Sequence, residues 1–188
     1  KEYAEQDPRI KLFSEKDSGP QEAISKGLNQ AQGDILCWLN ADDIFEAGTL
    51  QTVVDTFNKY PEKCWLYGRC SIINENGDEI RKLITLYKNI LGFFYSRNIL
   101  LCENYINQPS TFWKKSLWNN VGELNTNYKA AWDYELWIRM SDISPAIPIR
   151  TYLAKFRRHS KSISENNFEL QFDEELKIAS EKGNFVHK

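Results

Sequence analysis

Apolar and polar positions alternate along the chain in blocks that predict an α/β protein. Mostly apolar segments at 10–13, 35–39 and 65–68 have the length and composition of strands. The run at 35–39 is apolar at every position, which is typical of a buried strand in a parallel sheet. The chain is long enough to bury one core, so we expect a single domain built on a sheet.

The segment between the first two runs predicts a helix. Ser18 is a candidate N-cap, and Pro20 falls near the first helical position. Small residues then recur every four positions, which predicts one face packed closely on a sheet: Ala23, Gly27 and Ala31. We expect Gly33 to end the helix in the left-handed conformation.

The middle of the chain has a weaker pattern. Asn76-Gly77, between Ser71-Ile72-Ile73 and Glu79-Ile80-Arg81, predicts a hairpin turn. The segment 86–103 is apolar and aromatic without a clean period. Its Phe93-Phe94-Tyr95 run is a candidate sugar platform or subunit contact, and we favour packing in the core.

Two acids follow the run at 35–39 directly, as Asn40-Ala41-Asp42-Asp43. Ligands of open α/β sheets bind just beyond the carboxyl ends of strands, which is where these acids lie. Adjacent carboxylates repel each other, and a divalent cation bound to a phosphorylated ligand would relieve that repulsion. The alternative is an Asx turn that starts the next helix.

The residues from 14 to 43 resemble glycosyltransferase family 2, whose members have the GT-A fold and use nucleotide diphosphosugars. The family pattern runs S-x-x-D-x-G-x-x-x-A-x-x-x-G-x-x-x-A-x-G-D, an apolar strand and N/D-A-D-D, and every fixed position is present. The resemblance continues in four further segments, 107–115, 121–125, 131–139 and 156–164. It implies a GT-A domain with a mixed sheet flanked by helices over residues 1–164, followed by a polar helix within 165–188.

One family feature is missing from these residues. Members begin with two strands, ending P-x-Y/F-N and D-D/G-S, that hold the base and part of the ribose, and neither occurs here. We therefore expect a truncated GT-A domain, a C-terminal portion with about half of the nucleotide pocket, which has little or no activity alone.

The resemblance also implies roles for particular residues. Asp42, Asp43 and His159 are the candidate metal ligands, for Mn²⁺ or Mg²⁺. Asp17, Asn40 and Asp42 are candidates for contacting the nucleotide. Asn40 stands where many relatives have an Asp, which weakens metal binding from that position. Gln108 and Arg139 either line the site or support it.

Asp133 is the candidate general base, from the family's acidic motif at the start of a helix. The helix dipole should lower the pKa of this carboxyl group and keep it ionised. We expect Trp132, Leu136 and Met140 to pack inward, and Asp133 to face the cleft together with Trp137. Glu135 points elsewhere on the helix. The alternative is that Asp133 only caps the helix.

Composition narrows the function classes. Apolar residues make up 41% and charged residues 27%, and the net charge is −2, so nothing indicates nucleic acid or an anionic membrane as partner. No stretch approaches the length of a membrane span. Four scattered Cys and two His make a zinc site improbable and indicate buried free thiols in a reducing cytosol. Most aromatic rings should fill the core.

We therefore expect an inverting, metal-dependent transferase that moves a sugar, a hexose, from a nucleotide diphosphosugar to a saccharide or lipid-linked acceptor, in bacterial cell-surface polysaccharide synthesis. We expect it in the cytoplasm or peripherally at the inner face of the membrane, with a homodimer as one option. The alternative is a non-catalytic module, derived from such an enzyme, that binds carbohydrate or a partner.

Overall fold

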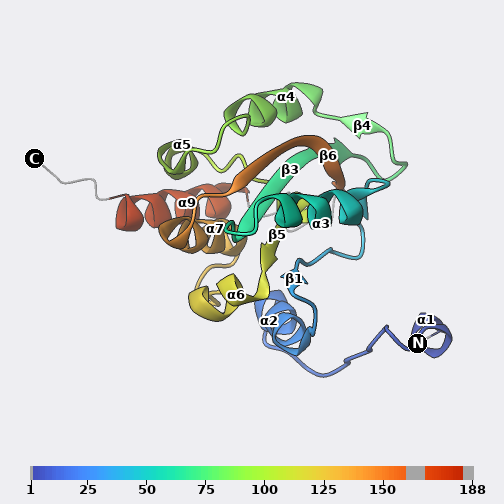
Figure 1. Ribbon diagram of the computed structural model, residues 1–188. Coiled ribbons are helices and arrows are strands. Elements are labelled where there is room, and N and C mark those ends of the chain that lie inside the picture. The colour runs from blue at the N-terminus through green and yellow to red at the C-terminus, as the bar shows by residue number, and fades with distance from the viewer. Residues whose placement is uncertain (1, 160–167, 184–188) are drawn as a thin grey trace, which may run out of the picture.

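A six-stranded mixed sheet forms the centre of the molecule in the computed structural model, which describes residues 2–159 and 168–183 (Figure 1). Its order is β1-β5-β3-β6-β2, with β4 paired to β3. The strands are β1 (Ile35–Leu36), β2 (Ile44–Phe45), β3 (Trp65–Ile73), β4 (Glu79–Ile80), β5 (Thr111–Lys114) and β6 (Ile147–Arg157). The β3–β6 pair is parallel and the other pairs are antiparallel. The predicted α/β class with a mixed sheet is confirmed.

Helices surround this sheet. They are α1 (Glu2–Gln6), α2 (Pro20–Gln30), α3 (Thr49–Lys59), α4 (Lys82–Leu91), α5 (Arg97–Cys102), α6 (Lys115–Val121), α7 (Trp132–Ile143) and α9 (Phe168–Lys182), with a 3₁₀ turn, η1, at Gln108–Ser110. Figure 1 shows α2 and α6 near β1 and β5 at one end, and α4 beyond β3 and β6 at the other. Both α5 and α9 contact α7.

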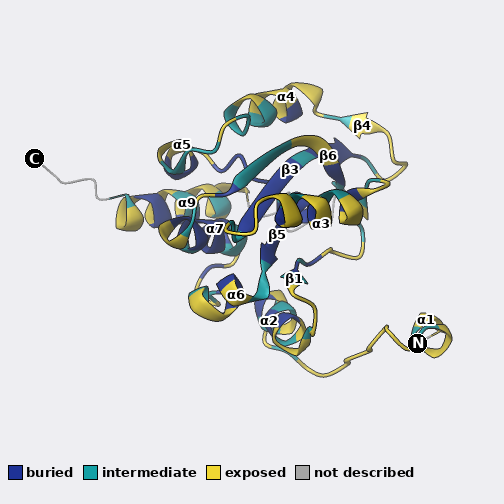
Figure 2. Ribbon diagram, viewed as in Figure 1, coloured by how far each residue is buried: buried dark blue, intermediate teal, exposed yellow. Residues whose placement is uncertain are grey.

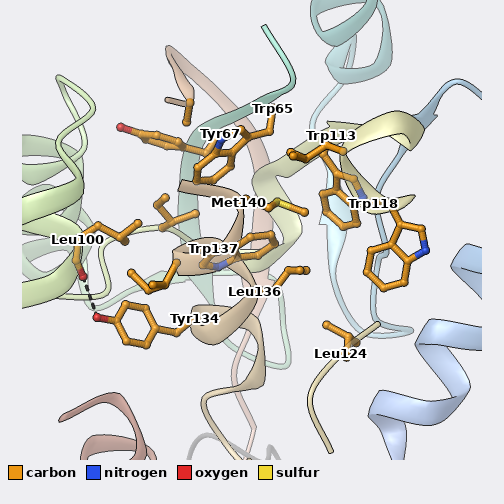
Figure 3. Packing of buried hydrophobic residues seen from close by; sticks show 14 of the residues in the cluster. Trp65, Tyr67, Leu100, Trp113, Trp118, Leu124, Tyr134, Leu136, Trp137 and Met140 are labelled. Carbon is orange, nitrogen blue, oxygen red and sulfur yellow. Dashed lines mark hydrogen bonds between the residues drawn. The ribbon is translucent and has the colours of Figure 1, made fainter. Parts of the chain in front are cut away.

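The largest core cluster is aromatic, as predicted. Trp65, Trp113 and Trp137 are fully buried and come from β3, β5 and α7 (Figure 3). The Trp137 ring stacks with the rings of Trp38 and Trp65 and is nearly parallel to both. The indoles therefore tie α7 to the middle of the sheet.

Helix α2 forms where the sequence predicts it, but its details differ. Its N-cap is Gly19, and the Ser18 hydroxyl donates to Glu22. The predicted small-residue face is wrong, because Ala23 and Gly27 are exposed. A different face of the helix is buried. Gln21 donates to the Tyr128 carbonyl, and Ser25 accepts from the Leu124 amide, so α2 packs on the loop at 124–128. The helix ends at Ala31 in extended backbone, and Gly33 does not have the predicted positive φ.

Two strand predictions also need correction. Residues 10–13 form no strand and are exposed. The run at 35–39 contributes only the two residues of β1, antiparallel to β5 rather than in a parallel pair. Because β1 is an edge strand with a single neighbour, the chain leaves the sheet after Leu36 and Leu39 is 39% exposed.

The hairpin prediction is confirmed, with Gly77 at φ 91° between β3 and β4. The segment 86–103 forms most of α4 and α5. Phe94 is 68% exposed, so the prediction that it packs in the core is wrong, whereas Tyr95 packs on Trp65. The four cysteines are free, but of the four only Cys70 is buried. Cys37 and Cys64 are partly exposed and Cys102 is exposed, so the prediction of buried thiols is wrong for these three.

Candidate active site

A cavity of about 410 Å³, which we call the cleft, opens where several loops and helices meet. Asn40 and Asp42 line it from the loop after β1, Gln108 from η1, Asp133 from the start of α7 and His159 from the segment after β6. Lys88 of α4 and Gln171 of α9 also line it. The cleft thus collects chemistry-bearing groups from segments far apart in the sequence.

Asp42 and His159 meet at one end of the cleft. The Asp42 Oδ2 and His159 Nε2 atoms are 3.0 Å apart. The Arg157 guanidinium donates from Nε to the backbone carbonyl of Asp42 at 2.9 Å. The end of β6 is therefore fastened to the Asp42 loop, and this brings His159 to the carboxylate.

Asp43 turns the other way. It is 6% exposed, does not line the cleft, and accepts hydrogen bonds from the Arg157 amide at 2.9 Å and from Asn40 Nδ2 at 3.0 Å. Burial raises the pKa of Asp43 to about 6, and these two hydrogen bonds oppose the shift. Only Asp42 of the acid pair faces the cleft, so the metal role predicted for Asp43 has no support from this geometry.

Asn40 is a donor in a chain of hydrogen bonds with a fixed direction. Gln108 Nε2 donates to the Trp38 carbonyl at 2.7 Å, which leaves Gln108 Oε1 as an acceptor. Asn40 Nδ2 donates both to this oxygen at 3.2 Å and to Asp43 Oδ2. A carboxylate cannot donate, so an amide suits this position better than the Asp that many relatives carry.

The Asp42 and His159 atoms suit a divalent cation. Octahedral Mg²⁺ bonds its ligands at about 2.0–2.1 Å, so adjacent ligand atoms lie roughly 3 Å apart, and the observed separation is 3.0 Å. Among residues 2–159 and 168–183, no group of three or more His, Cys, Asp or Glu side chains gathers around one point. A cation here would therefore take its remaining ligands from water and from the phosphates of a bound ligand.

Asp133 lies in the first turn of α7 and lines the cleft, as predicted. Its Oδ1 accepts from the Tyr134 amide at 2.7 Å. The predicted lowering of its pKa is wrong. Burial, with a smaller contribution from the Glu175 charge, raises the pKa of Asp133 to about 6, against the Tyr134 hydrogen bond and the Lys88 charge. The carboxyl group is still mostly ionised at neutral pH and is a competent base there.

The neighbours of Asp133 on α7 have structural roles. Leu136 and Met140 are buried as predicted, but Trp137 lies in the core, so the prediction that it faces the cleft is wrong. Glu135 points away from Asp133, as predicted, and pairs with Arg139. Arg139 also donates to carbonyls of the 121–123 turn, so it holds that turn rather than lining the cleft.

Asp17 lies away from the cleft lining. Its Oδ1 accepts from Lys26 Nζ at 2.7 Å, and Lys26 also pairs with Glu15 and Glu22. The structure thus brings together Asn40, Asp42, Asp133 and His159, and keeps Asp17 and Asp43 out of that group. A nucleotide contact by Asp17 stays a prediction.

Sequence reasoning missed Lys88 and Gln171. Lys88 makes no salt bridge with the described residues, and burial lowers the pKa of its ammonium group. It lies in the segment without a clean period, where no pattern signals an inward-facing lysine. Gln171 belongs to α9, which shows no specific match to the family.

Known proteins that resemble this chain are glycosyltransferases. The model of the family described as Glycosyl transferase family 2 matches residues 1–120. An uncharacterized glycosyltransferase of Rickettsia conorii is 26% identical over 86% of this chain, and the chondroitin synthase of Escherichia coli is 23% identical over 93%. The chain spans about a quarter of these relatives, 28% and 24% of their lengths.

Among solved structures, Staphylococcus aureus TarS residues 1–349 in complex with UDP-GlcNAc superposes with a TM-score of 0.55 at 14% identity. The match covers 81% of this chain and 44% of that one. At this identity the likeness shows the fold, which is that of a GT-A glycosyltransferase.

Proposed function

The chain belongs to glycosyl transferase family 2, and from that premise we propose that its cleft catalyses transfer of a sugar from a nucleotide diphosphosugar to a hydroxyl group of a saccharide or lipid-linked acceptor. The observation that carries the proposal is the meeting of Asp42, His159 and Asp133 in one cleft. The solved relative in complex with UDP-GlcNAc supports a sugar nucleotide as donor.

The departing diphosphate needs its negative charge neutralised. Mn²⁺ or Mg²⁺, held by Asp42 and His159, would supply the positive charge that neutralises it. Asn40 keeps the Asp42 loop in place through its bonds to Asp43 and Gln108. We retain Asp17 and Asn40 as proposed contacts on the nucleotide side.

The acceptor hydroxyl must lose a proton as it attacks the anomeric carbon. We assign this proton to the Asp133 carboxylate, which needs its pKa below the working pH. Attack by the acceptor on the face opposite the leaving diphosphate inverts the anomeric centre. Lys88 adds a positive charge that favours the ionised form of Asp133.

The wider setting is part of the same proposal. The chondroitin synthase relative supports a role in polysaccharide synthesis. We place the protein in the cytoplasm, peripheral at the inner face of the membrane, with a GT-A domain over 1–164 and a polar helix after it. None of the described helices is both long and apolar enough to cross a membrane.

The test is Asp133→Asn, with sugar transfer and donor affinity both measured. Transfer should fall by about 10²- to 10⁴-fold, because the base is lost, while donor affinity stays unchanged. Asp55→Asn on α3, an exposed acid bonded to Gln51, is the matched control and should keep full activity. Full activity of Asp133→Asn would remove Asp133 from the mechanism. Donor binding that needs no metal would contradict the role proposed for the cation.

A further inference from the structure

Helix α4 is turned with its apolar face outward. The buried residue of this helix is Thr85, and Lys88 lines the cleft on the inner side. Leu83, Tyr87 and Ile90 recur at the spacing of one helix face, and they are 82%, 49% and 64% exposed. A surface helix normally shows the reverse arrangement, so something apolar is expected to cover this face.

The apolar surface extends beyond these three residues. We call it the α4 face, and its large exposed apolar members are Leu83, Ile84, Leu86, Tyr87, Ile90 and Phe94. Figure 2 shows the exposed colour running along α4 at the edge of the molecule, far from α2 and α6. The α4 face thus combines leucine and isoleucine with aromatic residues. This composition is typical of a helix that lies in a lipid interface.

The segment that carries the α4 face is basic. Residues 80–102 include four basic residues and no acidic one, although the whole chain has a net charge of −2. Of the four, Lys88 lines the cleft. Arg81 is exposed at the start of α4, and Arg150 lies beside the face, with its guanidinium 3.8 Å from the centre of the Phe93 ring. Glu79 and Asp142 reach Lys82 and Arg97 from outside this segment.

A second copy of the chain is a poorer fit to this face. At a twofold contact the same surface meets itself, so the basic residues around one α4 would face those around the other. An anionic bilayer instead offers negative headgroups to the basic residues and acyl chains to the apolar ones. We propose that the α4 face docks onto the surface of an anionic lipid bilayer.

Docking would have a consequence for the cleft, a step that rests on the proposed transferase function. One side of α4 meets the lipid while Lys88 on its other side lines the cleft. A lipid-linked acceptor would therefore reach the cleft without leaving the membrane surface.

The test is co-sedimentation of the purified chain with vesicles of phosphatidylcholine, with and without phosphatidylglycerol. The wild type should bind the vesicles that contain phosphatidylglycerol, and added salt should weaken this binding. The double change Leu83→Ser plus Ile90→Ser should reduce the partition coefficient by about tenfold or more, because two apolar side chains no longer enter the lipid. Arg150→Gln should reduce binding to the anionic vesicles by a smaller factor of about five.

The matched control is Leu50→Ser plus Leu176→Ser, on α3 and α9, where the leucines are 60% and 63% exposed. This variant should bind like the wild type. Thermal unfolding and size-exclusion chromatography check that all variants are folded and report their oligomeric state. The proposal fails if the wild type binds no vesicles or binds both kinds equally. It also fails if the control variant loses as much binding as the Leu83→Ser plus Ile90→Ser variant. It also fails if the α4 change only dissociates a dimer. Loss of sugar transfer with vesicle binding intact would count against the transferase function alone.

Discussion

Replacing Asn40 by aspartate tests the hydrogen-bond chain that holds the acid loop. In Asn40→Asp, a carboxylate oxygen takes the place of Nδ2. In the unchanged protein, Nδ2 lies 3.0 Å from Asp43 Oδ2 and 3.2 Å from Gln108 Oε1. The variant carries the Asp found in many relatives, so resemblance alone predicts no harm. The directed hydrogen bonds predict damage.

The magnitude follows from the two hydrogen bonds that the substitution removes. A hydrogen bond to a charged group contributes about 1.5–3 kcal/mol and a neutral one about 1 kcal/mol. Because the Asn40 residue is exposed and its carboxylate would be partly solvated, we expect a total loss of about 2–3 kcal/mol at neutral pH. The loss depends on pH, since a proton shared between the two carboxyl groups restores one hydrogen bond.

Proton linkage determines how the loss of stability in Asn40→Asp changes with pH. Asp43 already has a pKa raised to about 6 by burial. A second carboxylate raises the pKa of the pair further, so folded protein binds a proton that the unfolded chain releases above its ordinary pKa of about 4. The lost stability is therefore small at acidic pH and grows as pH rises through the folded pKa.

Urea unfolding followed by tryptophan fluorescence at about pH 5 and about pH 8 measures this difference. Asn40→Asp should lose about 2–3 kcal/mol at the higher pH and less than about 1 kcal/mol at the lower. Asn40→Ala removes the donors without adding charge. Its loss should also grow with pH, because the Asn40 hydrogen bond opposes the raised pKa of Asp43, but less than in Asn40→Asp. Asn125→Asp, at a loop asparagine whose Oδ1 accepts a local amide, is the surface control. A pH-independent loss, or none, would refute the directed chain.

Three further predictions concern α7 and its supports. Trp137→Ala should lower the free energy of unfolding by about 4 kcal/mol in urea titrations, because a fully buried indole leaves a cavity; a loss below about 1 kcal/mol would contradict the core assignment. Glu174→Ala should lower it by about 3 kcal/mol, since its carboxylate accepts from the amides of 129–131 just before α7, and Glu174→Gln should lose less. Lys88→Met should raise the pKa of Asp133 and move the acid limb of the pH–rate profile to higher pH, while Lys88→Arg should leave it in place; an unmoved limb in Lys88→Met would show that the two charges are not coupled.

The residues of the candidate site were predictable where a local string carries them. The N-A-D-D sequence identifies the acid loop, but which acid faces the cleft depends on Arg157, which is 114 positions from Asp43 and joins it only in the folded sheet. The pKa of Asp133 was misjudged because the helix dipole is local, whereas the burial that outweighs it comes from packing around α7.

The orientation of α4 illustrates a second limit. Its apolar spacing is visible in the sequence, yet periodicity does not say whether that face meets the sheet or the solvent. The same limit applies to α2, where Gln21 and Ser25, rather than the small residues, are buried against the 124–128 loop. Lys88 and Gln171 reach the cleft only because α4 and α9 pack as they do.

The most direct test of a metal and nucleotide site is paramagnetic line broadening of backbone amide NMR signals by Mn²⁺ in the presence of UDP. Broadening should begin at the amides around Asp42 and His159, spread next to those near Asp133, and disappear in Asp42→Asn. Asp55→Asn on α3 should keep the wild-type pattern. Broadening centred elsewhere, or unchanged in Asp42→Asn, would contradict a cation and diphosphate site in this cleft.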